Sequence, residues 1–341
     1  MRGRWLINYM LKWPSYLKYQ LRISKRPLLL IIMITERCNS RCVMCNFWKN
    51  KDKKDELTPE EIREVLKSPI MRDLQHIALT GGEIFMREDV DQIIDVIYDT
   101  TGIRPTIGTN GLCVERLDSL LSSRKEKIGG VMISIDGVGR VHDRIRGNGT
   151  FKRSMQSIKL LKEKYGIKPT INMTVSRYNY DNLIKTYNLF RDCVFTYKVA
   201  KASRFHFGNN EDMDFIINRR QAERFFKAAE KIKDKNLYDV FLEEWVMEDK
   251  RPSPCYAGVS SIIMNPDGSI QPCLHKPQFG NIRQFPIDRI LISKGADAFR
   301  KSHKNCQDCY ERCAVDTFGI DLPKWVLKKK IKENCLVKRP A

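Results

Sequence analysis

Short apolar runs alternate with amphipathic stretches between Leu28 and about Phe207. The first run, Leu28–Ile34, is continuous and rich in β-branched residues, which is typical of a strand buried on both faces. Later runs predict further strands at His76–Leu79, Thr106–Thr109, Val131–Ile135, Thr170–Val175 and Phe205–Phe207. Because the connections between these runs are long enough for parallel crossovers, the pattern predicts six βα repeats.

The amphipathic stretches between these strands predict helices. Thr58-Pro-Glu-Glu opens the first, because it offers a capping threonine, a proline at the first helical position and a glutamate two residues later. Further helices are predicted at Asp89–Tyr98, Leu112–Ser122, Ser154–Lys164, Asn182–Arg191 and Arg219–Lys233. Six strands fall short of the eight that close a full barrel, so we expect an α/β fold, a partial (β/α)6 TIM-type barrel.

A different pattern follows the barrel repeats. Val259–Met264 and Ser269–Gln271 flank the turn sequence Asn265-Pro-Asp-Gly and predict a hairpin. We therefore expect three regions: a basic amphipathic segment at 1–26, the barrel at 27–235, and a small cysteine-rich extension with a basic tail at 236–341.

Charge is unevenly distributed along the 341 residues. There are 61 Lys and Arg against 41 Asp and Glu, for a formal net charge of +20. Residues 1–34 hold seven basic residues and no acid, and residues 322–341 hold seven basic residues against Glu333. The termini should therefore meet polyanions first, whether nucleic acid or an anionic membrane surface. Nucleic acid is the weaker expectation, because no basic stretch with interleaved aromatics lies beside the predicted barrel mouth.

The N-terminal segment has an apolar stripe of its own. Apolar residues recur at helical spacing at Leu6, Met10, Trp13, Leu17 and Leu21, with Pro14 breaking the helix into two pieces. Trp325–Lys332 has a similar aromatic and basic composition. Such segments suit an interfacial membrane anchor, and packing against the barrel is the alternative.

Neither a membrane span nor a signal peptide is predicted. The longest apolar run, Leu28–Ile34, has seven residues, whereas a span needs about 18. Polar residues interrupt the first 15 positions, unlike an apolar signal region. We expect a cytoplasmic protein. Binding of its basic termini to membranes would make it a peripheral membrane protein.

Eleven cysteines in a reducing compartment favour metal ligation over disulfides. Cys38, Cys42 and Cys45 stand directly after the first predicted strand, at the end of a parallel barrel where active sites form. Three thiolates without a nearby histidine do not complete a tetrahedral zinc site. They can hold three irons of a [4Fe–4S] cluster and leave the fourth iron open.

A second motif, Thr80-Gly81-Gly82-Glu83, follows the second predicted strand. The two glycines permit close approach of a ligand to the backbone, and Glu83 offers an acceptor for an ammonium group. Alone this sequence would be an ordinary turn, but it comes one βα unit after the cysteine loop.

Together these two motifs resemble those of the radical S-adenosylmethionine (SAM) enzymes, over roughly residues 28–210. The resemblance implies a cluster on Cys38, Cys42 and Cys45 whose open iron binds the amino and carboxylate groups of SAM. It further implies one-electron cleavage of SAM to methionine and a 5′-deoxyadenosyl radical that abstracts hydrogen from a substrate. The electron would come from a flavodoxin- or ferredoxin-like donor.

The resemblance assigns further residues to SAM binding. Gly81, Gly82 and Glu83 match the segment that receives the methionine ammonium. Ser134 and Asp136 resemble a segment near the SAM ribose and carboxylate, and Arg146 the arginine that follows it. Asn110 and Asn172 are weaker candidates. The family usually has an aromatic residue where this chain has Met44, so Phe47 or Trp48 is the candidate for covering the adenine.

The rear cysteines form a second constellation. Cys255 and Cys273 flank the predicted hairpin, and Cys306 and Cys309 follow in a Cys-x2-Cys pair. This arrangement resembles the SPASM or twitch extension of radical SAM enzymes, which binds auxiliary clusters. We expect one auxiliary [4Fe–4S] cluster on these four residues, with structural zinc as the alternative. Cys313 and Cys335 could substitute as ligands or stay free.

The sequence therefore predicts a radical SAM enzyme, of oxidoreductase or transferase type, whose substrate it does not identify. Peptides or proteins are the first substrate class, because related extended enzymes often act on them, and lipid-linked molecules are the second. An iron–sulfur electron carrier, a metal-stabilised binding module and a nucleic-acid-modifying radical SAM enzyme are the alternatives.

Overall fold

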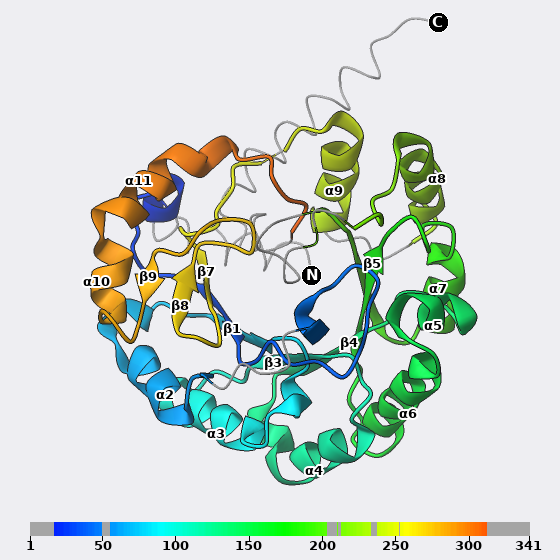
Figure 1. Ribbon diagram of the computed structural model, residues 1–341, viewed down its shortest axis with the longest axis horizontal. Helices are drawn as coiled ribbons and strands as arrows, with labels where there is room; N and C mark the ends of the chain where they lie inside the picture. The colour runs from blue at the N-terminus through cyan, green and yellow to red at the C-terminus, as the bar shows by residue number, and fades with distance from the viewer. Residues whose placement is uncertain are drawn as a thin grey trace, which may run out of the picture.

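One curved sheet of nine strands forms the centre of the computed structural model, which describes residues 17–49, 55–202, 210, 213–232, 237–251 and 253–311. The strand order is β6-β5-β4-β3-β2-β1-β7-β8-β9. Figure 1 looks along the axis of this sheet and shows the helices arranged around its outer face.

The first six strands are parallel and follow one another in the sheet in chain order. They are β1 (Leu29–Met33), β2 (His76–Thr80), β3 (Thr106–Thr109), β4 (Gly130–Ser134), β5 (Thr170–Val175) and β6 (Val194–Val199). The partial TIM-type barrel expected from the sequence is thus confirmed. The predicted strand Phe205–Phe207 lies outside the described residues. The sequence analysis did not predict β6, because the polar residues Thr196 and Lys198 interrupt its apolar run.

Helices cover the outside of these strands and bury two apolar clusters against them, a large one along β1 to β5 and a second one at β5 and β6. They are α2 (Pro59–Lys67), α3 (Val90–Thr101), α4 (Val114–Arg124), α5 (Arg140–Arg146), α6 (Thr150–Glu163), α7 (Leu183–Leu189), α8 (Arg219–Ala229) and α9 (Leu237–Glu248). The predicted capping box is present: the Glu61 N–H donates to Thr58 Oγ1 (3.2 Å), and the Thr58 N–H donates to a Glu61 carboxylate oxygen (2.8 Å).

The rear hairpin continues the barrel sheet, which the sequence analysis did not predict. Strand β7 (Ser261–Met264) pairs in parallel with β1, and β8 (Ser269–Gln271) and β9 (Gly280–Asn281) follow in antiparallel order. The predicted turn between β7 and β8 is confirmed: Gly268 takes a positive φ of 84°, and its N–H donates to Asn265 O. Helices α10 (Ile287–Ile292) and α11 (Lys294–Ser302) then cover this part of the sheet.

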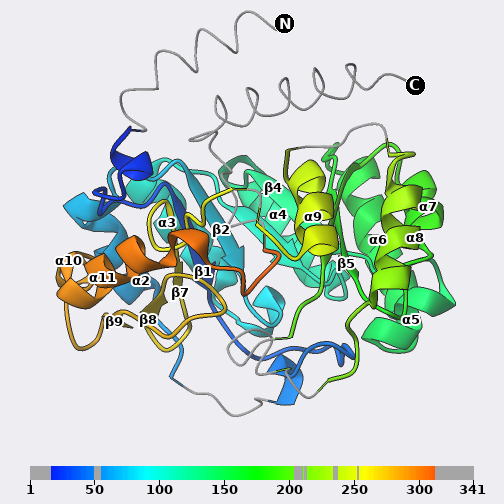
Figure 2. The same ribbon diagram turned by 90° about the horizontal axis from the view of Figure 1, so that it is seen from above.

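The start of the described chain packs against the rear region. Tyr19 and Leu28 form a small buried cluster with Tyr256 and Val259, and the Arg22 guanidinium donates to Arg300 O (2.7 Å) and to Cys255 O. Figure 2 shows this segment, in dark blue, at the opposite end of the barrel from the short helix η1 (Phe47–Lys49). Within the described ranges, no helix has the length and apolar character to cross a bilayer.

Candidate cofactor and metal centre

A cavity lies at the carboxyl ends of the parallel strands and is called here the front cavity. Its lining includes Cys38, Ser40, Cys42, Cys45, Phe47, Gly81, Gly82, Asn110, Ser134, Arg146, Asn172, Thr174 and Lys198. Among its described lining residues the only charged side chains are those of Arg146 and Lys198. The cavity therefore offers thiols, hydroxyls, amides and cations, and it sits where parallel barrels build active sites.

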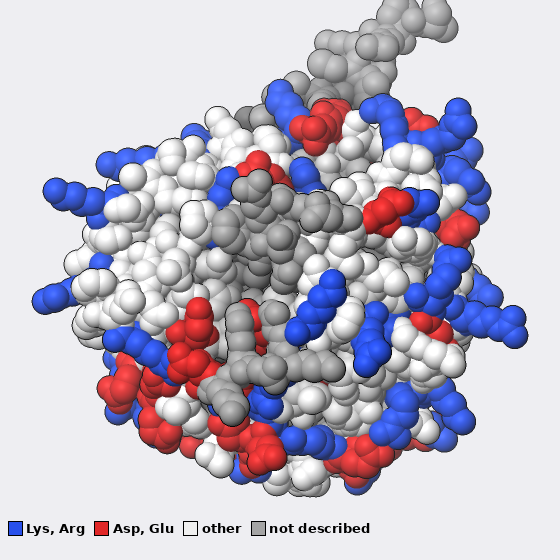
Figure 3. Space-filling view, viewed as in Figure 1, with Lys and Arg blue, Asp and Glu red and all other residues white. Residues whose placement is uncertain are grey.

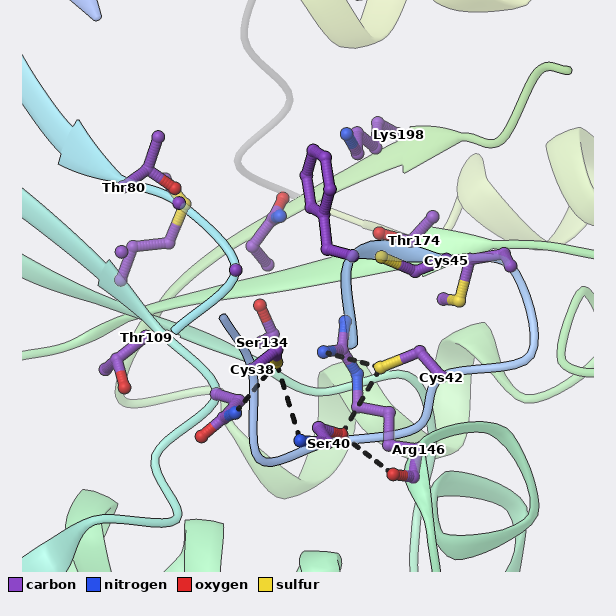
Figure 4. Close-up of a pocket in the computed structure, with 18 residues that line it drawn as sticks. Cys38, Ser40, Cys42, Cys45, Thr80, Thr109, Ser134, Arg146, Thr174 and Lys198 are labelled. Carbon is purple, nitrogen blue, oxygen red and sulfur yellow. Dashed lines mark hydrogen bonds between the residues drawn. The ribbon is translucent and has the colours of Figure 1, made fainter. Parts of the chain in front are cut away.

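The loop after β1 brings Cys38, Cys42 and Cys45 to the lining of this cavity (Figure 4). Polar groups surround two of the sulfurs: the Ser40 N–H donates to Cys38 Sγ (3.4 Å), and Ser40 Oγ lies 3.4 Å from Cys42 Sγ. A Val43 N–H bond to Ile145 O (2.9 Å) ties the loop to α5. The structure thus brings together the three thiols that the sequence predicted as ligands.

The donor set of the front cavity fits an iron–sulfur cluster. Burial, reinforced by the neighbouring thiols, raises the pKa of Cys38 and of Cys45 to about 12, so metal is needed to hold them as thiolates. Across the described part of the chain, no three His, Cys, Asp or Glu side chains stand close enough to share a single metal ion. Three thiols spread around a cavity suit a cluster in which each binds a different iron.

Arg146 is held beside the thiols by a buried ion pair. Its Nε donates to Asp136 Oδ2 (2.6 Å), and its Nη1 lies 3.8 Å from Cys42 Sγ (Figure 4). Burial opposes the positive charge, but Asp136 and the thiols outweigh it and raise the pKa of Arg146. Asp136 is fully buried, and its other oxygen accepts the Thr174 N–H (2.7 Å). Ser134 and Arg146 therefore line the cavity, whereas Asp136 positions Arg146 from behind it.

His142 next to this ion pair makes stability depend on pH. Its Nδ1 accepts the Asp136 N–H, and burial together with the charge of Arg146 lowers its pKa to about 4 from 6.5. Between these values the unfolded chain binds the extra proton, so the stabilisation is complete above pH 6.5 and declines as pH falls. From pH 7.5 to 5.5 we expect wild type to lose roughly 1.4 kcal/mol more unfolding free energy than His142→Gln, measured by urea unfolding. Equal losses in the two proteins would contradict this assignment.

Backbone hydrogen bonds tie the Gly81-Gly82-Glu83 segment to the residues just before the cysteine loop. The Gly82 N–H donates to Thr35 O (2.7 Å), and the Glu83 N–H donates to Arg37 O (2.9 Å). A Cβ on Gly81 would lie 2.4 Å from Thr35 O, so this close backbone contact requires glycine. This close backbone contact is thus a structural reason for glycine that was not predicted from the sequence. The two glycines also line the cavity.

The Glu83 carboxylate faces away from open solvent and accepts hydrogen bonds from Thr109 Oγ1 (2.8 Å), the Asn110 N–H (2.8 Å) and the Phe85 N–H (3.3 Å). Glu83 is 1% exposed, and burial raises its pKa despite these donors. Its carboxylate therefore joins the ends of β2 and β3. The contact between Glu83 and a methionine ammonium stays a prediction.

Replacing Gly82 with alanine should disturb the cysteine loop. The new Cβ would stand 2.4 Å from Arg37 O and 2.5 Å from Glu36 O, directly before Cys38. We expect a loss of about 1–3 kcal/mol in stability together with reduced iron binding at the front thiols, measured by thermal unfolding and iron analysis. Gly130→Ala is the matched control, because its Cβ would meet only Thr106 Cγ2 at 3.9 Å. Equal behaviour of the two variants would contradict the prediction.

The two aromatic candidates for the adenine are placed differently. Phe47 lines the front cavity and is buried. Trp48 is not among the lining residues, and its ring instead lies near the cations of Arg41 and Lys49. Asn110 and Asn172, the weaker sequence candidates, both line the cavity. Phe47 is therefore the better placed aromatic residue.

The rear cysteines lie in a second apolar cluster around α9. Cys255, Cys273 and Cys309 are buried there with Trp245, and Cys306 packs against them. The pKa of Cys273 is raised by burial and by the other three thiols, so Cys255, Cys306 and Cys309 all lie near Cys273. All described cysteines are free of disulfides, while Cys313 and Cys335 lie outside the described residues.

One ion pair connects the front cavity to the rear loop, and the sequence analysis missed it. Lys198 Nζ lies 3.1 and 3.2 Å from the two carboxylate oxygens of Glu311, which stands two residues after Cys309. Both side chains are mostly buried, at 18% and 16% exposure. The polar inward position of Lys198 in β6 was the available signal, but the pattern alone did not identify that strand.

Charged side chains of a single sign do not cover the described rim of the barrel mouth. Figure 3 shows acidic side chains gathered at the lower left of the described surface, over α2 and α3, with lysines and arginines spread around the rest of the rim. The net charge of +20 is thus not concentrated in one basic patch on the described part of this face.

Two family models match the chain. Residues 32–190 match the radical SAM superfamily, and residues 255–313 match SPASM, an iron-sulfur cluster-binding domain. The first match spans the front thiols and the Gly-Gly-Glu segment, and the second includes all four described rear cysteines.

Curated relatives align over most of the chain. The antilisterial bacteriocin subtilosin biosynthesis protein AlbA of Bacillus subtilis is 28% identical over 78% of this chain, and the alignment spans 60% of AlbA. A GTP 3′,8-cyclase of Aquifex aeolicus is 25% identical over 76% of this chain and 85% of its own length.

The fold is also that of a solved structure. Streptococcus suis SuiB bound to S-adenosylmethionine superposes with a TM-score of 0.61 at 17% identity, covering 89% of this chain and 76% of SuiB. At that identity the likeness concerns the fold alone.

Proposed function

Because the chain belongs to the radical SAM superfamily and carries a SPASM extension, we propose that it cleaves SAM reductively in the front cavity and uses the resulting radical to abstract hydrogen from a substrate. The observation that carries the proposal is the convergence of three thiols and the Gly81-Gly82 backbone on one cavity. No histidine or carboxylate competes with those thiols among its described lining residues.

The residues of the front cavity have separate tasks in this proposal. Cys38, Cys42 and Cys45 would hold a [4Fe–4S] cluster, which supplies the electron for SAM cleavage when bound. The Gly81-Gly82 backbone and Ser134 would orient SAM, and Phe47 would cover its adenine. Arg146, fixed by Asp136, places a positive charge beside the Cys42 sulfur, where it would face one ligand of the cluster.

The rear cysteines would hold one auxiliary [4Fe–4S] cluster. Four neighbouring thiols in an apolar setting are the ligand set that such a cluster takes. The Lys198–Glu311 ion pair links this region to the front cavity, so a substrate entering the cavity would lie close to both sites.

A peptide or protein is the substrate class that we propose. AlbA, a bacteriocin biosynthesis protein, aligns over 78% of the chain. The GTP 3′,8-cyclase aligns over a similar length, so a nucleotide is the competing class. Incubation with each class of compound and SAM, followed by mass spectrometry, separates the two.

The test is reductive SAM cleavage by the reconstituted protein. Purified chain is loaded anaerobically with iron and sulfide, then supplied with dithionite and SAM. We expect 5′-deoxyadenosine and methionine in equal amounts, and neither product without dithionite. Bound iron without any 5′-deoxyadenosine would contradict the proposal and favour an electron carrier.

A second proposal concerns peripheral membrane association. Leu17 and Leu21, one helical turn apart, and Ile23 and Ile292, which share one groove, are between 46% and 63% exposed. These four residues are called here the N-terminal patch. The seven basic residues of 1–34 give this end a charge that suits anionic lipid, although Lys18 pairs with Asp73 and Lys25 with Asp297.

Sedimentation with anionic vesicles tests this association. We expect the full chain to pellet with phosphatidylglycerol vesicles at low salt, to release as salt rises, and to stay in the supernatant when Leu21 and Ile23 are both changed to glutamate. Leu189→Glu is the matched control, because Leu189 is 45% exposed on α7, away from the patch. A wild-type chain that stays in the supernatant at low salt would contradict the association.

A further inference from the structure

A buried arginine stands directly beside the rear thiols. Arg251 follows α9 and a left-handed turn at Asp249, and it is only 7% exposed. Its guanidinium carbon lies 3.8 Å from the ring centroid of Trp245, which is itself fully buried. Stacking on an indole holds a guanidinium flat and fixes the direction of its N–H groups.

The N–H groups of Arg251 point to the Cys-x2-Cys segment. Nε donates to Cys306 O (2.8 Å), and Nη2 lies 3.5 Å from Cys309 Sγ. The backbone N–H of Arg251 also donates to Gln307 Oε1 (2.6 Å). One residue thus contacts three of the four residues from Cys306 to Cys309, and it directs positive charge at one of the thiols.

The effect of this charge on a cluster follows from electrostatics. Reduction adds one electron to a cluster and makes its sulfurs more negative. A fixed cation that donates to one of these sulfurs stabilises the reduced form more than the oxidised form, and burial strengthens the interaction. Lysine would keep the charge but not the planar fork or the stacking on Trp245.

We propose that Arg251 is a positioning residue that raises the reduction potential of the auxiliary cluster on Cys255, Cys273, Cys306 and Cys309. The inference rests on the proposed function, because it requires a cluster at these four thiols. A higher reduction potential makes the rear cluster the better electron acceptor. A reaction in which an electron passes from the substrate to the rear site requires such an acceptor.

The test isolates the rear cluster and measures its potential. The parent protein carries alanine at Cys38, Cys42 and Cys45, so only the rear site binds iron. R251Q and R251K are compared with this parent in a dithionite titration with redox mediators, followed by electron paramagnetic resonance (EPR). R219Q is the matched control, because Arg219 also donates to the end of α9, at Met247 O (3.0 Å), but is exposed.

We expect a more negative potential in R251Q, a smaller shift in R251K and the parent value in R219Q. Because EPR detects only loaded sites, partial iron loss in R251Q does not hide the shift. A loaded R251Q with the parent potential would overturn the role of Arg251 alone. If R251Q binds no iron while R251K keeps the parent potential, Arg251 serves cluster assembly only. That result would also overturn its role in setting the potential. A parent without rear iron would overturn the auxiliary cluster itself, and the inference with it.

Discussion

Replacing Cys38, Cys42 or Cys45 with alanine is expected to abolish 5′-deoxyadenosine formation. Each change removes one of the three thiols that line the front cavity among the described residues, and no fourth thiol in that described lining would replace it as a ligand of the proposed cluster. Product formation should fall to the level seen without protein in all three variants. The measurement is chromatography of 5′-deoxyadenosine after anaerobic incubation with dithionite and SAM.

Cys193→Ala is the matched control for these variants. Cys193 is buried in the main core, and its thiol donates to Oδ1 of the neighbouring Asp192 (3.7 Å). We expect this variant to keep wild-type product formation and iron content. Undiminished 5′-deoxyadenosine from the triple variant of Cys38, Cys42 and Cys45 would contradict the assignment of the front site.

The rear site should account for half of the bound iron. One cluster at each site gives about eight irons per chain in the wild type and about four in the front triple variant. Changing Cys255 and Cys273 to alanine should also leave about four irons. That double variant should unfold more easily than wild type, because the proposed cluster would join the hairpin to the loop after α11.

Iron and zinc analysis by plasma mass spectrometry measures this outcome, with thermal unfolding as the second readout. A wild-type count near four irons accompanied by zinc would favour structural zinc at the rear thiols. A count near twelve would show a third cluster and would contradict the single auxiliary site.

Most of the fold was predictable because its signals are local. Five of the six strands from β1 to β6, the capped helix at Pro59 and the hairpin turn at Asn265 are each determined by short stretches of sequence. The pairing of β7 with β1 was not predictable, because it joins Leu29 to Ser261 across more than 200 residues. Strand β6 was missed because Thr196 and Lys198, the second of which lines the cavity, interrupt its apolar pattern.

The candidate site was predictable where spacing carries the chemistry. The three front thiols and Gly81 and Gly82 were identified from motifs, and the structure places all five around one cavity. The motifs could not show which side chains act indirectly. The carboxylates of Asp136 and Glu83 accept hydrogen bonds from other groups of the protein. Arg251 was not predicted because a lone arginine in a chain with 61 Lys and Arg gives no signal. Lys198 was not predicted because its strand, β6, was not identified.

Direct binding of SAM to the front cluster decides whether the front cavity is the site of SAM cleavage. The double variant of Cys255 and Cys273 carries only the front cluster, which is reduced and examined by EPR and electron–nuclear double resonance with SAM labelled at its amino nitrogen and carboxylate oxygens. We predict a changed EPR spectrum and couplings from both labels, because three thiolates leave one iron open to SAM. A reduced cluster whose spectrum stays the same on addition of SAM, with no coupling from either label, would contradict the account.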